Sequence, residues 1–103
     1  MLTQVPDRAT AVKLAAALVG SRIAACVSIG TPVESLYHWQ GRIETASEIP
    51  IAIKAPVANY ADVEALIRAN HPYELPEILA VPVSHGLPAY LQWVATEANG
   101  VRG

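Results

Sequence analysis

The feature that most limits the folds open to this chain is a long extended segment at positions 33–56, VESLYHWQGRIETASEIPIAIKAP. Polar and apolar residues alternate along most of it, which is the pattern of a β-strand with two different faces. Gly41 lies within the alternating stretch. The segment therefore predicts either one long bent strand or two collinear strands that meet at a kink at Gly41.

Two helices are predicted, one before and one after this segment. Residues 8–20 follow Asp7, a good N-cap, and we expect Gly20 to supply the left-handed residue that ends the helix. A second helix is expected at residues 59–70, because Pro72 prevents its continuation beyond residue 70 or 71. The apolar faces are expected to consist of Val12, Ala15, Ala16, Leu18 and Val19 in the first helix, and of Tyr60, Val63, Leu66 and Ile67 in the second.

The other segments complete the pattern of one fold. Strands are expected at residues 1–5, 22–29 and 77–84, and a last helix opens at Pro88 and continues through residues 89–98. The apolar face of that helix is expected to consist of Leu87, Tyr90, Leu91 and Val94. The order of elements predicts the α+β class: a ferredoxin-like βαββαβ sandwich with a C-terminal helix, in a single domain over residues 1–103.

Pro50 is difficult to place in this topology. It lies in what should be a central strand, where proline cannot donate a ladder hydrogen bond. The first strand, also expected to be central, has only about five residues before Pro6. Either a bulge accommodates Pro50, or the short first strand leaves its position unpaired; both alternatives stay open here.

Composition excludes several classes of protein. Of the 103 residues, 52% are hydrophobic and only 16% are charged, so we expect apolar surface to be covered by self-association. No run is long enough to span a bilayer, and the N-terminus lacks the basic head and apolar middle of a signal peptide. Basic residues are scattered and the net charge is −2, which argues against a nucleic-acid partner. The lone Cys26 permits no intrachain disulfide and fits the cytoplasm.

The residues that could carry chemistry form no strong motif. Cys26 is interpreted as a small buried hydrophobe. His38, His71 and His85 include no pair at the spacing of a metal site on one helix or strand, and His71 reads equally well as a ligand or as a helix-terminal histidine. Glu74 and Glu77 point to opposite faces of an extended chain, so joint acid–base chemistry is not expected.

An aromatic surface is the clearest binding feature. Tyr37 and Trp39 lie two residues apart, hence on the same face of a strand. They could belong to the core, to a subunit interface or to a platform for a ligand, and we prefer the interface. Lys54 ends the apolar run IPIAIK and could hold an anion or a glutamate of another chain near such an interface.

Four blocks, RIAACVSI, SLYHWQGRIE, HPYELPEI and GLPAYLQW, follow one another in an order and at separations that resemble the CutA divalent-cation tolerance family. The resemblance covers nearly the whole chain. It implies a tight homotrimer similar in architecture to PII signalling proteins, with strands that pair across subunit boundaries. It also implies a role in tolerance of divalent metal ions, copper binding in some members, and no enzymatic activity.

The resemblance carries site residues over to this chain. It implies an intersubunit pocket lined by Trp39, Lys54, Tyr73, Glu74 and Glu77. The family's proposed copper ligands are a first-strand cysteine and two adjacent histidines, whose positions are occupied here by Thr3, Asn70 and His71. Only His71 matches, so any Cu²⁺ site rests on His71 and should be weaker than in relatives with all three ligands. The first strand also looks several residues shorter than the family's.

Three hypotheses follow from these observations. The leading one is a homotrimer that responds to divalent metal ions, without a nucleic-acid or membrane partner. The second is a small-molecule-binding signalling protein, or an enzyme that uses Tyr73, Glu77, Lys54 or Cys26 in the cleft between subunits. The third is a scaffold for another protein.

Overall fold

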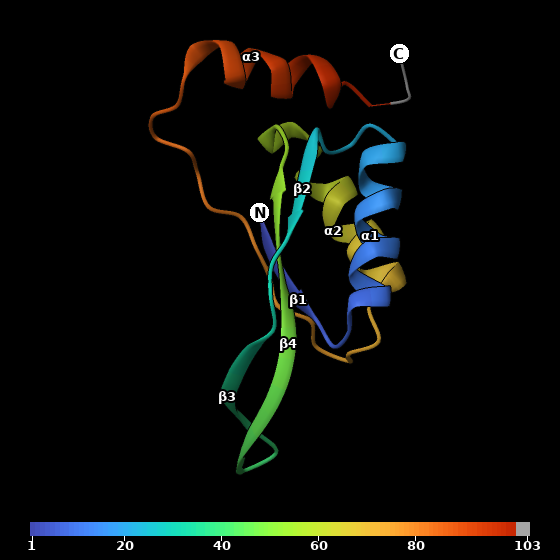
Figure 1. The fold of residues 1–103 in the computed structure, drawn as a ribbon, viewed down its shortest axis with the longest axis vertical. Helices are drawn as coiled ribbons and strands as arrows, with labels where there is room; N and C mark the ends of the chain where they lie inside the picture. The colour runs from blue at the N-terminus through green and yellow to red at the C-terminus, as the bar shows by residue number, and fades with distance from the viewer. Residues whose placement is uncertain (101–103) are drawn as a thin grey trace.

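The computed structural model describes residues 1–100, and its layers are those of the predicted sandwich (Figure 1). In chain order the elements are β1 (Leu2–Val5), α1 (Arg8–Gly20), β2 (Cys26–Ile29), β3 (Val33–Trp39), β4 (Arg42–Lys54), the short 3₁₀ helix η1 (Val57–Asn59), α2 (Tyr60–Asn70), β5 (Ile78–Leu79) and α3 (Pro88–Glu97). The molecule is elongated, with extents of 44 × 27 × 22 Å. Among the described residues, no helix is long and apolar enough to cross a membrane.

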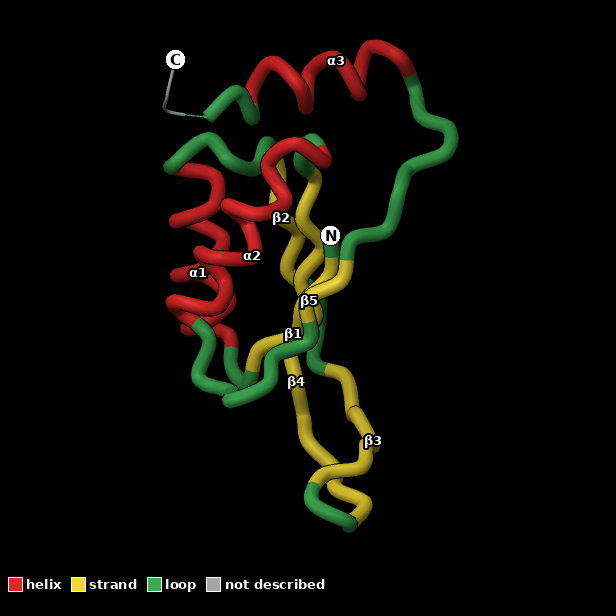
Figure 2. Tube along the Cα trace, turned by 180° about the vertical axis from the view of Figure 1, so that it is seen from behind, coloured by secondary structure: helices red, strands yellow, loops and turns green. Residues whose placement is uncertain are grey.

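The sheet has the predicted ferredoxin-like arrangement. Its strand order is β2-β4-β1-β5, and β3 pairs with β4 beyond β2, all antiparallel. The prediction that β1 is central is confirmed, since it lies between β4 and β5. Helices α1 and α2 cover one face of the sheet, as Figure 2 shows from behind. The second strand of the βαββαβ pattern is divided into β2 and β3, which pair with successive parts of β4.

The expectation of one bent strand or two collinear strands at 33–56 is wrong, because β3 and β4 form a hairpin. They pair in register from Val33 opposite Glu48 to Trp39 opposite Arg42. The turn residues Gln40 and Gly41 have φ values of 50° and 78°. Positive φ at both positions is the backbone of a type I′ turn, the tightest hairpin connection. Alternation continues across so short a turn, so periodicity alone could not separate a kink from a reversal.

A bulge accommodates Pro50, which decides between the two alternatives. Ile29 lies opposite Ile51 and Val33 lies opposite Glu48, so the chain between β2 and β3 has one more residue than the facing part of β4. The Gly30 N–H donates to the Pro50 carbonyl at 2.9 Å. Since the nitrogen and carbonyl of a strand residue face the same neighbour, the proline nitrogen faces this irregular stretch rather than β1.

The core lies between the sheet and the two helices, and it corrects the predicted face of α1. Its fully buried large side chains are Val5, Leu14, Leu18, Ile51, Val63 and Ile67. In α1 the buried residues are Ala11, Leu14 and Leu18, whereas Val12 and Val19 are 51% and 42% exposed. This helix is rich in alanine on all sides, so its apolar pattern did not define one face. The α2 prediction holds, with Val63 and Ile67 buried.

The start of α1 is as predicted, but its end is not. The Asp7 side chain accepts a hydrogen bond from the Thr10 N–H at 2.8 Å, which caps the helix. Gly20 is the last helical residue, and the left-handed residue is Arg22, with φ 62°. Residues 21–25 form the turn after α1, so β2 begins at Cys26 and not at residue 22 as predicted.

The predicted strand at 77–84 is reduced to Ile78–Leu79. Residues 80–87 leave the sheet as an exposed arm that carries α3 to one end of the molecule (Figure 1). Only Val94 of the predicted α3 face is buried, while Tyr90 and Leu91 are 41% and 42% exposed. Within residues 1–100, no strand pairs with this arm.

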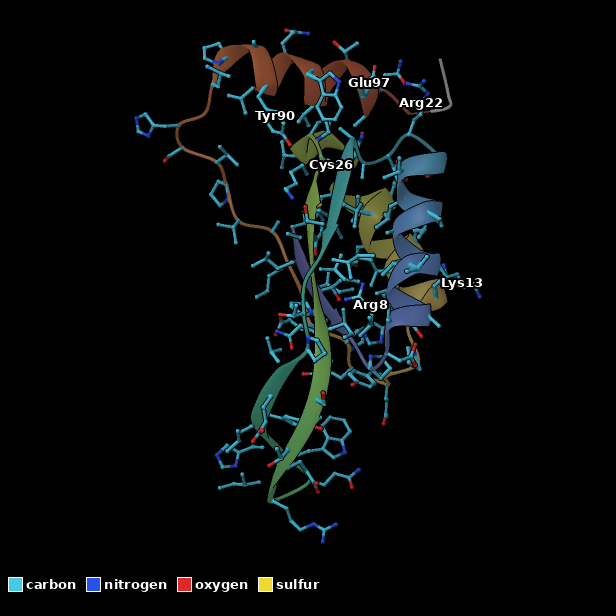
Figure 3. All side chains as sticks on the ribbon, in the orientation of Figure 1. Arg8, Lys13, Arg22, Cys26, Tyr90 and Glu97 are labelled. Carbon is cyan, nitrogen blue, oxygen red and sulfur yellow. The ribbon has the colours of Figure 1, made fainter. Side chains whose placement is uncertain are left out.

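The C-terminal end of α3 is the end that is tied to the body. Asn59 Nδ2 donates to the carbonyl oxygens of Ile23 and Ala98, at 3.1 and 2.8 Å. An Arg22 guanidinium nitrogen donates to the Glu97 carbonyl at 3.3 Å, and Figure 3 shows these two side chains close together. The attachment holds α3 while leaving most of its apolar side chains uncovered.

Candidate functional site

A cavity of about 850 Å³ lies between β3 and the segment 72–77 that follows α2. It brings together four of the five residues predicted for the pocket, namely Trp39, Tyr73, Glu74 and Glu77. Tyr37, His38 and Glu48 of the hairpin also line it, as does Gln4 of β1. The volume falls within the range of about 300–1,000 Å³ that is usual for small-molecule sites.

The hairpin positions one wall of the cavity. Side chains alternate along β3, so Ser35, Tyr37 and Trp39 lie on the same face. Glu48 of β4 shares that face, because it is the cross-strand partner of Val33. Ser35 also donates from Oγ to Gln4 Oε1 at 3.1 Å, which joins the hairpin to β1.

The segment HPYELPEI forms the opposite wall, and His71 holds its first part. Tyr73 N–H donates to His71 Nδ1 at 3.1 Å, so Nδ1 is the unprotonated nitrogen. The other nitrogen, Nε2, then carries the hydrogen and donates to the Gln4 carbonyl at 2.6 Å. The two rings of His71 and Tyr73 lie 4.7 Å apart, tilted by 53°. These contacts place Tyr73 over the cavity.

Tyr73 and Glu48 form the polar centre of the cavity. Burial and a hydrogen bond to the Glu48 carboxylate raise the pKa of Tyr73 to about 12. Glu48 is only 8% exposed. A phenol that donates to a buried carboxylate satisfies it as a hydrogen-bond acceptor, but it does not neutralise its charge.

Lys54, the fifth predicted pocket residue, does not line this cavity in the single chain. It lies at the far end of β4, where Nζ donates to Ser28 Oγ at 2.6 Å. Its cross-strand partner is Cys26, which is half-buried. Its place in an intersubunit pocket stays a prediction.

Sequence reasoning missed Glu48 and Gln4 as site residues. Both sit in strands at positions that read as ordinary polar, outward-facing residues. No sequence motif identifies them. Glu48 lies at the cavity because it pairs with Val33 in the hairpin and because residues 72–77 pass close to that face. Tyr37 was noticed for its aromatic ring but was not assigned to the pocket.

The positions that resemble copper ligands do not fit a copper ion as they are arranged here. Thr3 is 1% exposed and its Oγ1 has no hydrogen-bond partner among the described residues, but a hydroxyl is a poor copper ligand. Asn70 donates from Nδ2 to the Leu66 carbonyl, and both His71 nitrogens are engaged. Residues 1–100 contain no group of three His, Cys, Asp or Glu side chains placed to hold a metal. Metal binding by His71 stays a prediction that requires one of its hydrogen bonds to be exchanged.

Comparison with known proteins gives one consistent result. The family model of the CutA1 divalent ion tolerance protein matches residues 1–97. The Divalent-cation tolerance protein CutA of Escherichia coli (strain K12 / DH10B) is 36% identical over 94 residues, which is 91% of this chain and 84% of the relative. The crystal structure of CutA from Xylella fastidiosa superposes with a TM-score of 0.91 at 42% identity, covering 94% and 93% of the two chains. The CutA from Archaeoglobus fulgidus, whose name calls it periplasmic, superposes with a TM-score of 0.91 at 32% identity, covering 94% of each chain.

Proposed function

Because the chain belongs to the CutA1 divalent ion tolerance family, we propose that it acts in the response to and tolerance of divalent metal ions as a homotrimer of PII-like architecture. The observation that carries the proposal is the match over residues 1–97, at the same fold and nearly full length. The role is one of binding rather than catalysis, and the lone cysteine favours the cytoplasm.

Uncovered apolar surface supports the trimer. On the hairpin, Leu36 and Ile43 are 67% and 69% exposed. On the arm, Val81 and Val83 are 59% and 71% exposed, next to the short edge strand β5. Contiguous apolar surface and an open strand edge are unfavourable in water, and pairing with another copy would cover both.

The face of the sheet opposite α1 and α2 supports the same proposal. Thr3 and Val5 point toward the helices and are buried, so Leu2 points the other way and is 39% exposed. Its cross-strand partner Leu79 is 53% exposed. Two neighbouring leucines on an uncovered sheet face are typical of a subunit contact.

Sedimentation velocity at low micromolar concentration tests the trimer. Three chains of 10.9 kDa should sediment as one particle of about 33 kDa. Val83→Glu on the arm should dissociate it, whereas Val12→Glu, the same change on the outer side of α1, should not. A compact single-chain particle for the wild type would overturn the assembly.

Growth measurements test the role in tolerance. A strain without the gene should grow less well than its parent on rising Cu²⁺, Zn²⁺ or Co²⁺, and the wild-type gene should restore growth. Equal growth of the two strains over the whole series of ions would overturn the proposed role.

Copper binding at His71 is tested separately by calorimetric titration of Cu²⁺. His71→Ala should weaken binding, while His85→Ala, on the exposed arm, serves as the matched control. Identical isotherms for the wild type and His71→Ala would remove the copper site. Because His71 also has a structural role, each variant is first checked for its fold by circular dichroism.

A further inference from the structure

The wall of the cavity between β3 and residues 72–77 has three carboxylates and a single basic side chain, that of His38. Glu48, Glu74 and Glu77 contribute to its wall, and no Lys or Arg of the described residues does. Arg42, opposite Trp39, is the arginine of the hairpin. Arg42 pairs instead with Glu44 at 3.8 Å and is 81% exposed. The cavity therefore carries negative charge that its own wall does not balance.

The negative charge of the cavity is not confined to carboxylates in contact with water, because Glu48 is buried. Glu48 is 8% exposed and lines the cavity beside Tyr73, so its carboxylate is largely removed from water. A carboxylate removed from water in this way interacts strongly with a cation that reaches it, because water screens the attraction less than at the surface.

Aromatic rings form the rest of the wall. Tyr37 and Trp39 come from β3, and Tyr73 comes from the segment across the cavity. The faces of such rings attract cations, with Trp the most favourable, and they also bury apolar groups. Carboxylates together with aromatic rings are the chemistry that recognises an ammonium or amidinium group attached to an apolar body.

A bare metal ion suits this wall poorly. No three His, Cys, Asp or Glu side chains within residues 1–100 are close enough to share an ion. The cavity of about 850 Å³ is also far larger than a metal centre and of the size of a small organic molecule.

We propose that this cavity binds an organic cation, with its ammonium or amidinium group at Glu48 and Glu77 and its apolar body against Tyr37, Trp39 and Tyr73. His71 does not line the cavity but positions Tyr73 through the Tyr73 N–H, and the proposal goes beyond the role in metal tolerance. It gives each chain a small-molecule site with a defined ligand class.

Calorimetry on the full-length protein in its solution assembly tests the proposal with three probes of similar shape. These are 2-phenylethylammonium, the neutral 2-phenylethanol and the anionic 3-phenylpropionate. The ammonium should bind at least about tenfold more tightly than the alcohol, and the carboxylate should not bind. Raising the salt concentration should weaken binding of the ammonium.

Variants locate the binding. Glu48→Gln and Glu77→Gln should each weaken ammonium binding several-fold, and Trp39→Leu should weaken both the ammonium and the alcohol. Glu34→Gln, a matched change on β3 outside this cavity, should leave the affinity unchanged. Glu77 is exposed, so its variant tests the charge without disturbing the core.

Three results would overturn the proposal: no binding of the ammonium, equal affinity for the ammonium and the alcohol, or unchanged affinity in both glutamate variants. None of these outcomes bears on the sedimentation or growth experiments, so this proposal and the proposed function fail separately.

Discussion

His71 Nε2 lies 2.6 Å from the Gln4 carbonyl oxygen, and this contact joins the end of α2 to the central strand β1. With Nδ1 accepting from the Tyr73 N–H, the single ring of His71 connects three segments of the fold. The histidine that attracts attention as a metal ligand therefore has a structural role in the single chain.

We expect His71→Ala to lower the free energy of unfolding by about 1–3 kcal/mol, because it leaves the Gln4 carbonyl and the Tyr73 N–H without their partners. The change is measured as a shift of the urea midpoint. His85→Ala should be neutral, since His85 is exposed on the arm and its hydrogen bond is to its chain neighbour Ser84. Equal midpoints for the wild type and His71→Ala would contradict the structural role.

Substitutions at Gly30 and Pro50 should have strongly non-additive effects on the free energy of unfolding. A Cβ at Gly30 would approach Pro50 Cγ to 2.8 Å, whereas the next contacts are at 3.5 Å. Gly30→Ala should therefore destabilise the protein by about 1–3 kcal/mol in the wild type and by less in a Pro50→Ala background. A double-mutant cycle measures the difference, and strictly additive effects would show that the two residues do not meet.

The turn of the hairpin should respond to substitution according to its backbone. Gly41→Ala places a side chain at φ 78° and should cost about 1 kcal/mol. Gln40→Asn should raise stability slightly, because asparagine tolerates positive φ and Asn-Gly is the preferred type I′ pair. Gly20→Ala is the contrasting control: it is helical with open space around it, so alanine should stabilise by about 0.5–1 kcal/mol. A destabilising Gly20→Ala or a neutral Gly41→Ala in thermal unfolding would contradict this account.

Tyr73 should make stability fall at alkaline pH. Its pKa is raised from 10.0 to about 12 by burial and by the Glu48 carboxylate, with smaller contributions from Tyr37 and Asp7. Above pH 10 the unfolded chain loses this proton first, so the free energy of unfolding decreases up to about pH 12. Tyr73→Phe should remove this part of the decrease. Urea midpoints measured across the range would contradict the prediction if the two proteins followed the same curve.

Much of the fold could be predicted because the signals are local. Asp7 caps α1 directly, Pro72 limits α2, and the order of strands and helices indicates the sandwich. The face of α1 could not be predicted, since alanine is apolar enough to lie on either side of a helix. The reversal at Gln40 was also missed, because alternating residues look the same in a straight strand and in a hairpin.

The sequence by itself therefore determined the helices, the order of helices and strands, and the family, but not the extent of every strand. Only the tertiary structure decided the site, because Glu48, Trp39 and Tyr73 meet through the register of the hairpin and the path of residues 72–77. Secondary structure depends on neighbours along the chain, which the sequence displays. A cavity depends on residues that are distant along the chain, and those meet only once the backbone hydrogen bonds have aligned their strands.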